Sequence, residues 1–185
     1  TFIFDNEPEV MADGRILFIR SDNFFDRGKV ETLLHAVHPD GSEGYTEFGL
    51  DLGPEYGGRL RAFHVGSPAP MPDGRVAYVS NTGIAVGQPG CRQEDLQNIG
   101  VEAGDVAALP DGRLLCTVPK KTPIEKMVKK QKKIVQDYSY EKIAIVDPRA
   151  KRDEVVSVFD STEEPLHAPV YLGARPKPPL LAKKV

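Results

Sequence analysis

The chain contains little that would fix a reaction. It has two cysteines, no tryptophan and no run of apolar residues long enough to span a membrane. Neither cysteine begins the Cys-x-x-Cys-His sequence of covalent haem attachment, and there is no Gly-x-Ser-x-Gly nucleophile elbow and no Gly-Lys-Ser/Thr phosphate loop. A formal net charge of −3 argues against nucleic acid as a general partner. We therefore expect no cofactor and no metal, and we assign no catalytic residue.

The sequence also lacks an initiator methionine and a secretory leader, and residues 1–4 already look like part of a strand. This start favours a piece of a longer polypeptide. Localisation is therefore unknown from the residues themselves, because a leader peptide would lie upstream.

One short motif occurs three times. Asp-Gly-Arg stands at residues 13–15, 73–75 and 111–113, each time between an apolar segment and a β-rich run. An Asp-Gly pair in that setting is the strongest short-range signal for a β-hairpin, because both central residues of its turn need positive φ. Three copies in 185 residues predict a repeat protein.

Each copy opens a unit of four strands. In the first copy, residues 32–38 and 45–48 are a further pair of strand-like runs, and residues 142–146 and 154–159 repeat that pair in the third. Consecutive motifs begin 60 and 38 residues apart, so the core unit has roughly forty residues, with insertions. Four antiparallel strands in a unit of that length are typical of a β-propeller blade.

The sequence therefore predicts an all-β fold: a β-propeller made of four-stranded antiparallel blades, about three of them plus part of a fourth. Three and a fraction blades do not close a ring, so further blades of the same polypeptide or partner copies must complete it. We expect the partial propeller at 1–174, its blades at roughly 5–60, 61–100, 101–160 and, for the start of the fourth, 165–173, and a Pro/Lys-rich exit segment at 175–185.

One segment interrupts the β pattern. Residues 122–125, Thr-Pro-Ile-Glu, form a capping box with proline at the first helical position, and apolar residues recur after it at helical spacing. We predict an inserted basic amphipathic α-helix at about 123–136. Residues 120–133 carry seven lysines and one acid, a net +6, which leaves −9 for the rest of the chain.

This predicted helix is a candidate partner-binding element through Lys126, Lys129, Lys130, Lys132 and Lys133. Its lysines would dock an acidic partner or an anionic membrane surface. The alternative is a helix whose apolar stripe covers the propeller edge while its lysines face water.

The residues just before the first strand of each blade form the candidate ligand site. In a propeller they face the central channel, and here they are Glu7, Ser67, Asp105 and His167, with His64 nearby. Carboxylates and imidazoles at one mouth would bind a cation or another small polar ligand. The alternative is that they satisfy strand-start N–H groups and solvate the channel.

The two cysteines, Cys91 and Cys116, lie in adjacent units. They form a disulfide candidate if the compartment is oxidising. Otherwise Cys116, inside an apolar strand, is a small buried hydrophobe.

The repeat resembles that of the TolB-like (WD-repeat-like) six-bladed β-propellers over about residues 1–179. The motifs closest to one subgroup, the hydrazine synthase alpha subunit middle-domain group, stand at residues 13–22, 26–28, 38–42, 167–170 and 175–179. The resemblance implies a propeller and favours a periplasmic or secreted location. Hydrazine synthase is a multihaem enzyme, but no haem-binding or catalytic position carries over to this chain.

We therefore expect a non-catalytic β-propeller scaffold or binding module for a protein or a small polar ligand, held at the channel mouth or the loops. The alternative is a propeller domain of a larger redox enzyme related to the hydrazine synthase alpha subunit, with its catalytic parts outside this chain. We do not expect activity from this chain alone.

Overall fold

A computed structural model of the chain describes residues 3–24, 29–48, 65–80, 82–91, 95–128, 131–150, 155–160, 166 and 169–170. These residues form twelve β-strands and contain no α-helix, so the described part has no helix that would cross a membrane. The all-β prediction is confirmed.

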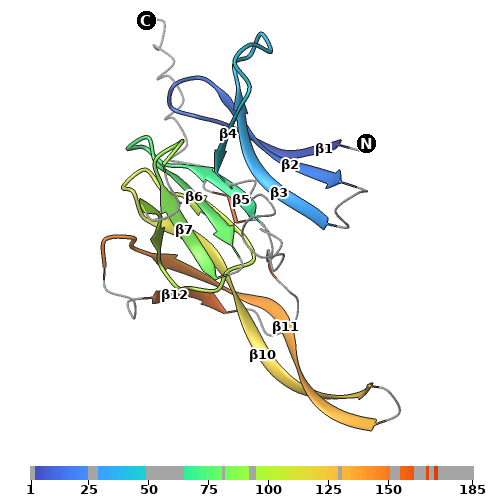
Figure 1. Cartoon of the computed structure of the whole chain (residues 1–185). Coiled ribbons are helices and arrows are strands. Elements are labelled where there is room, and N and C mark those ends of the chain that lie inside the picture. The colour runs from blue at the N-terminus through green and yellow to red at the C-terminus, as the bar shows by residue number, and fades with distance from the viewer. Residues whose placement is uncertain are drawn as a thin grey trace, which may run out of the picture.

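The strands form three four-stranded antiparallel sheets, in each of which neighbours in the sheet are neighbours in the chain (Figure 1). Sheet 1 consists of β1 (Ile3–Val10), β2 (Ile16–Phe24), β3 (Lys29–Val37) and β4 (Tyr45–Phe48). Sheet 2 consists of β5 (Val65–Pro70), β6 (Val76–Ser80), β7 (Gly83–Gly87) and β8 (Gln97–Asn98). Sheet 3 consists of β9 (Val106–Ala108), β10 (Leu114–Val128), β11 (Gln131–Val146) and β12 (Val155–Asp160).

Each Asp-Gly-Arg motif is the turn between the first and second strands of its sheet. In all three turns the glycine has positive φ (83–85°) while the aspartate does not. The expectation that both central residues need positive φ is therefore wrong. The loop is longer than the two-residue turn assumed, with the N–H of Met11 donating to the carbonyl of Arg15 at 2.9 Å in the first copy. Longer hairpin loops of this kind place only one residue in the left-handed region.

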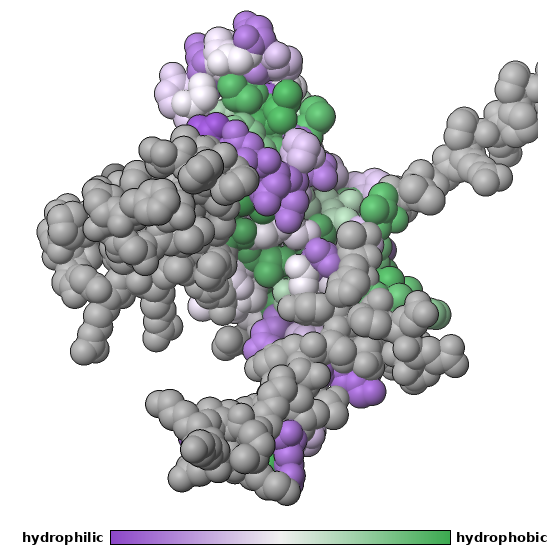
Figure 2. Space-filling model, turned by 90° about the vertical axis from the view of Figure 1, so that its right-hand side faces the viewer, coloured by the Kyte–Doolittle hydropathy of each residue, from purple (hydrophilic) through white to green (hydrophobic). Residues whose placement is uncertain are grey.

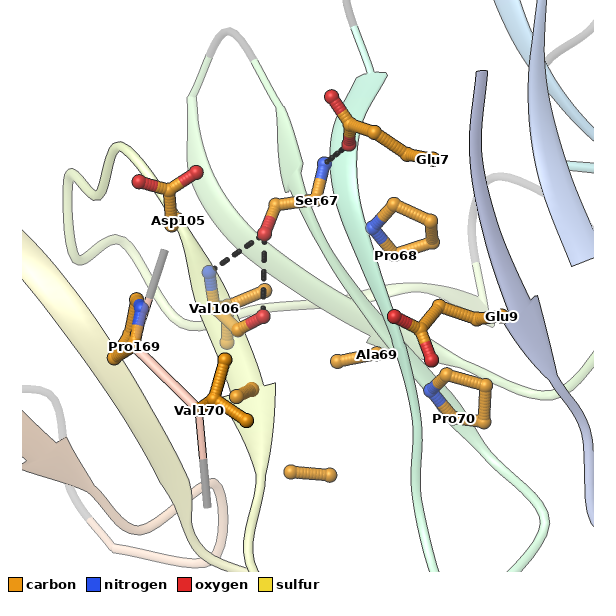
Figure 3. A pocket seen from close by; sticks show the side chains of 12 residues that line it. Glu7, Glu9, Ser67, Pro68, Ala69, Pro70, Asp105, Val106, Pro169 and Val170 are labelled. Atoms are coloured by element: carbon orange, nitrogen blue, oxygen red, sulfur yellow. Dashed lines mark hydrogen bonds between the residues drawn. The ribbon is translucent and has the colours of Figure 1, made fainter. Parts of the chain in front are cut away.

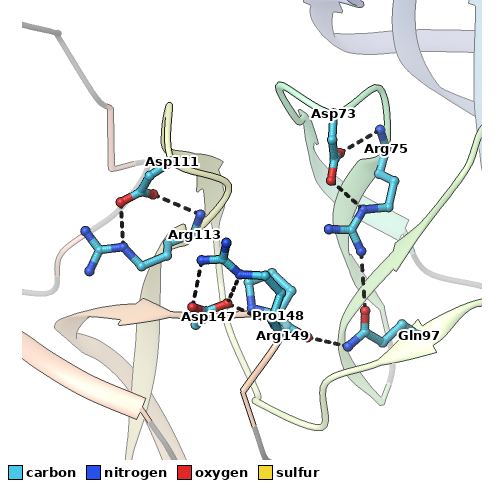
Figure 4. Close-up of polar contacts among 8 residues, drawn as sticks. All are labelled: Asp73, Arg75, Gln97, Asp111, Arg113, Asp147, Pro148 and Arg149. Carbon is cyan, nitrogen blue, oxygen red and sulfur yellow. Dashed lines mark hydrogen bonds and ion pairs between the residues drawn. The ribbon is translucent and has the colours of Figure 1, made fainter.

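The arginine of each motif belongs to the turn itself (Figure 4). Arg113 donates its backbone N–H and its Nε–H to the two carboxylate oxygens of Asp111, at 3.0 and 2.7 Å, and Arg15 and Arg75 repeat these contacts. The N–H groups of Arg113 hold the pKa of Asp111 below its ordinary value. The motif is thus a self-contained turn, and this explains why it is copied as a unit.

The core lies in two layers on either side of sheet 2, which is the middle sheet in Figure 1. One apolar cluster joins sheets 1 and 2, and the other joins sheets 2 and 3. Every residue of β7 is buried, because β7 packs on both faces. The clusters are centred on Leu17, Leu34 and Tyr78 in the first case and on Ile84, Leu114 and Val146 in the second.

The two end sheets bury only one face. Val156 and Phe159 of β12 stand opposite Ile145 and Ile143 in the register, on the face of sheet 3 that points away from the core, and they are 62% and 55% exposed. The surface view shows hydrophobic side chains emerging between hydrophilic ones on one side of the molecule (Figure 2). Sheet 1 has a shallow cavity of about 540 Å³ on its outer face, beside Phe18 and His35.

Polar contacts connect each sheet to the next. The guanidinium of Arg15 forms an ion pair with the buried carboxylate of Glu47 in β4, and the carbonyl of Glu47 accepts the N–H of Gly90 from sheet 2 at 3.1 Å. In sheet 2, Arg75 donates to Gln97 of β8 at 3.5 Å, and Gln97 donates to the carbonyl of Pro148 in sheet 3. In sheets 1 and 2, the arginine of the Asp-Gly-Arg turn is thus linked through the fourth strand of its own sheet to the segment that follows in the next sheet.

The prediction of a helix at 123–136 is wrong. Pro119 to Val128 of β10 pairs residue by residue with Gln131 to Tyr140 of β11, in a two-stranded arm that projects from sheet 3 (Figure 1). We call this arm the lysine-rich ribbon. Its strands continue the ladder already formed by 114–118 and 142–146, and each added pair needs no new nucleus. The β-branched residues that suggested a helical stripe are equally suited to strands.

The predicted start of a fourth blade at 165–173 and the exit segment at 175–185 fall mostly outside the described residues. Leu166, Pro169 and Val170 are described there, and none of them belongs to a strand.

We predict that Glu47→Gln lowers the free energy of unfolding by about 1–2 kcal/mol, because the partly buried guanidinium of Arg15 loses one of its two carboxylate partners while the amide keeps the size of the side chain. Urea denaturation of the full chain measures this. Glu43→Gln is the matched control, because its exposed ion pair with His38 should contribute less than about 1 kcal/mol. Equal losses in the two variants would contradict the assigned role of Glu47.

Candidate ligand pocket

A cavity of about 480 Å³ lies where the first strands of the three sheets approach one another (Figure 3). It is lined by residues of β1, β5 and β9, together with Asp105 just before β9 and with Pro169 and Val170 from the far end of the described chain. Each of these strands is the edge strand of its sheet, so three strand edges face one space.

The structure brings together three of the five residues predicted for the ligand site. Glu7, Ser67 and Asp105 each stand six positions before the aspartate of their turn, and all three line this cavity. His64 and His167 lie outside the described residues. Repeat-equivalent positions are therefore neighbours in space although they are far apart in the chain.

Glu7 and Ser67 have an unusual backbone. Both have φ of 50°, the left-handed region, which costs about 1–2 kcal/mol for a residue with a Cβ atom. At both positions the pairing with the second strand shifts register, between Asn6 and Glu9 in β1 and between Gly66 and Ala69 in β5. The same bulge is thus built twice, and it turns the edge of each strand toward the cavity.

Hydrogen bonds from Ser67 hold the three edges together. Its N–H donates to Oε2 of Glu7 at 2.6 Å. Its hydroxyl accepts the N–H of Val106 at 2.9 Å and donates to the carbonyl of Val106 at 3.2 Å. Glu7 and Ser67 lie inside β1 and β5, and not before these strands as the sequence predicts. Among the described contacts of their side chains, only the N–H of Val106, the first residue of β9, is a strand-start group.

Asp105 is positioned by sheet 3. Its backbone N–H donates to Oγ1 of the buried Thr117 at 2.9 Å, and its carbonyl accepts the N–H of Thr117 at 3.1 Å. Figure 3 shows its carboxylate and that of Glu7 at the same end of the cavity, with Ser67 between them. The hydroxyl of Thr117 also donates to Oδ2 of Asp105 at 3.5 Å, so both the backbone and the carboxylate of Asp105 are held by β10.

The charged side chains in the described lining of the cavity are all negative. Its described lining contains three carboxylates, on Glu7, Glu9 and Asp105, and no lysine, arginine or histidine. Partial burial raises the pKa of Glu9 above its ordinary value. A positively charged group placed in the cavity would favour the ionised form of Glu9.

Sequence reasoning missed Glu9, Pro169 and Val170 as lining residues. Glu9 follows the bulge, and because the bulge shifts register, simple alternation along the strand does not predict which way Glu9 faces. Pro169 and Val170 reach the cavity from a distant part of the chain, and no local signal indicates that approach.

The two cysteines are free thiols that pack in different layers. Cys116 is fully buried between sheets 2 and 3, and burial raises its pKa to about 12. Cys91 is half-buried against the layer between sheets 1 and 2, and its pKa is also raised, by partial burial and then by Asp95.

The lysines assigned to a helix lie on the ribbon instead. Lys126 is in β10, Lys132 and Lys133 are in β11, and Lys129 and Lys130 fall outside the described residues. The three described lysines do not line the cavity.

Comparison with protein-family models finds no match to this chain, and comparison with curated protein sequences finds none either. Among the described residues no group of three or more histidine, cysteine, aspartate or glutamate side chains is arranged to hold a metal ion.

We predict that Ser67→Ala lowers the free energy of unfolding by about 1–2 kcal/mol, because it removes both hydrogen bonds to Val106 and keeps the strained φ. Ser67→Gly loses the same bonds but relieves about 1 kcal/mol of left-handed strain, so it should be the milder variant. Chemical denaturation of both variants checks the order. The reverse order would show that the backbone at Ser67 is not strained.

A thiol assay tests the state of the cysteines. A disulfide-exchange reagent should modify at most Cys91 in the native chain, since Cys116 is buried and its pKa of about 12 leaves almost no thiolate at neutral pH. In denaturant both should react. Two unreactive cysteines under both conditions would demonstrate a bridge instead.

Proposed function

We propose that this chain is part of a β-propeller and that it acts as a non-catalytic binding module, which holds a small, positively charged polar ligand between the first strands of its sheets. The observation that carries this proposal is the convergence of Glu7, Ser67 and Asp105, three equivalent positions of the repeat, on one cavity.

The arrangement of the sheets supports the propeller. Three consecutive four-stranded meanders pack face to face, and their first strands adjoin one another: β1 contacts β5, and β5 contacts β9. In a propeller the first strands surround the central channel. The outer faces of sheets 1 and 3 carry apolar residues, as expected of faces against which further blades pack.

The chemistry of the lining supports a cationic ligand. The described lining contributes three carboxylates and no cationic side chain, which gives it a negative potential. The hydrogen bonds that Ser67 makes to Glu7 and Val106 hold the walls in place before the ligand arrives. Pre-organised walls lower the entropic cost of binding.

The proposal is tested by calorimetric titration of the full chain with a series of primary amines and polyamines, and with alcohols and carboxylates of matching length. Only the amines should bind. Glu7→Gln and Asp105→Asn should each weaken binding about tenfold, since each removes one charge that faces the ligand. Asp95→Asn, an exposed acid outside the cavity, should leave it unchanged.

The pH dependence has a defined sign. The pKa of Glu9 is raised, so this carboxylate becomes neutral at a higher pH than an ordinary glutamate. Amine affinity should therefore fall as the pH drops from neutrality through the pKa of Glu9, and Glu9→Gln should remove that part of the decline. Binding of alcohols or carboxylates as strong as that of amines would rule out the proposed ligand class.

A further inference from the structure

We propose that the lysine-rich ribbon binds an acidic, extended polypeptide segment, which adds as a further strand along the outer edge of β11. This site is separate from the cavity and does not depend on the function proposed for it.

The first observation is an open strand edge. β12 covers the outer edge of β11 only between Lys142 and Val146. From Gln131 to Tyr140, β11 pairs with β10 on one side, and no described strand pairs with it on the other. A two-stranded ribbon by itself is marginally stable in water, and an exposed edge is a template for another strand.

The second observation concerns prolines, which distinguish the two edges of the ribbon. Pro119 and Pro123 of β10 have no N–H, and strand prolines stand where the N–H would point away from the ladder. The outer edge of β10 therefore lacks donors at two positions. The register places Tyr140 and Gln136 opposite these prolines, so the N–H groups of Tyr140 and Gln136 point outward from β11. Only the β11 edge offers an uninterrupted row of donors.

The third observation is charge. Residues 120–133 carry a net +6 on a chain whose remainder carries −9. Lys126 stands directly opposite Lys133 in the register, and like charges in that position destabilise a strand pair. An anionic partner relieves this repulsion, while the acidic remainder of the chain repels the same partner and directs it to the ribbon.

A polypeptide fits these features better than other polyanions do. Only another backbone satisfies the outward N–H and C=O groups of β11, whereas phosphates would meet the lysines alone. A membrane surface needs a face that is apolar throughout. Within residues 120–133 lysine occurs at both odd- and even-numbered positions of each strand, so strand alternation leaves no face of the ribbon apolar throughout.

The experiment measures the fluorescence anisotropy of a labelled peptide in which glutamate alternates with valine, titrated with the full chain. A second peptide of the same sequence has its alternate amides N-methylated, so it keeps the charge but cannot pair along one edge. We expect the first peptide to bind in a salt-sensitive manner and the methylated peptide to bind at least about tenfold more weakly.

Two variants separate the backbone edge from the charge. Gln136→Pro removes an outward donor of β11 opposite Pro123, so it should keep the ribbon and weaken peptide binding about tenfold. Lys132→Glu/Lys133→Glu should weaken it by at least as much. Lys183→Glu/Lys184→Glu makes the same change of charge elsewhere in the sequence and should leave binding unchanged. Thermal unfolding monitors the fold of each variant.

Three results would overturn the proposal. The first is equal affinity for the plain and the methylated peptide. This comparison needs no variant, so it tests the proposal even if Gln136→Pro does not fold. The second is binding of duplex DNA, or of vesicles containing phosphatidylserine, that is tighter than peptide binding and lost in Lys132→Glu/Lys133→Glu. The third is full peptide affinity in a folded Gln136→Pro chain.

Discussion

The structure depends on the burial of one sheet face against the next. A four-stranded antiparallel sheet with apolar residues on both faces cannot be stable alone in water, because each face exposes side chains whose burial supplies most of the favourable free energy. Sheet 2 solves this with neighbours on both sides, and its strand β7 is buried at every residue. Sheets 1 and 3 each pack against one other described sheet and keep apolar side chains such as Phe159 partly exposed. The need to bury apolar faces therefore explains why sheet 2 lies between sheets 1 and 3.

Stacking brings the first strands together, and that proximity creates a second requirement. The edges of β1, β5 and β9 approach one another without forming a ladder, so their backbone groups need other partners. The left-handed bulges at Glu7 and Ser67 turn side chains and N–H groups toward the adjacent edge, where they hydrogen-bond. The cavity is the space left where side chains, in place of a ladder, join the three edges.

Sequence reasoning was successful where the information was local or repeated. The Asp-Gly-Arg turns contain their own hydrogen bonds, so they predicted three hairpins, and their register predicted that Glu7, Ser67 and Asp105 are equivalent. It failed where the secondary structure of a segment depended on the strands beside it. The capping box at 122–125 is a valid local signal for a helix, but these residues extend a ladder that begins at Leu114 and continues past a register shift between Val118 and Pro119. Cooperativity with that ladder outweighs a weak local preference.

The pairing in this ladder also determines which backbone groups of the ribbon lack a described partner strand. Among the described strands, β9 pairs with β10 only from Leu114 to Cys116 and β12 pairs with β11 only from Lys142 to Val146. In the ribbon, β10 and β11 therefore pair only with each other. On the β10 side, two prolines remove donors and so reduce the tendency to pair. The described part of β11 contains no proline, and its lysines discourage pairing with a basic or neutral strand but not with an acidic one. A surface that protects one edge and keeps the other open, at a cost in stability, is better explained by a partner strand than by solvation of the lysines.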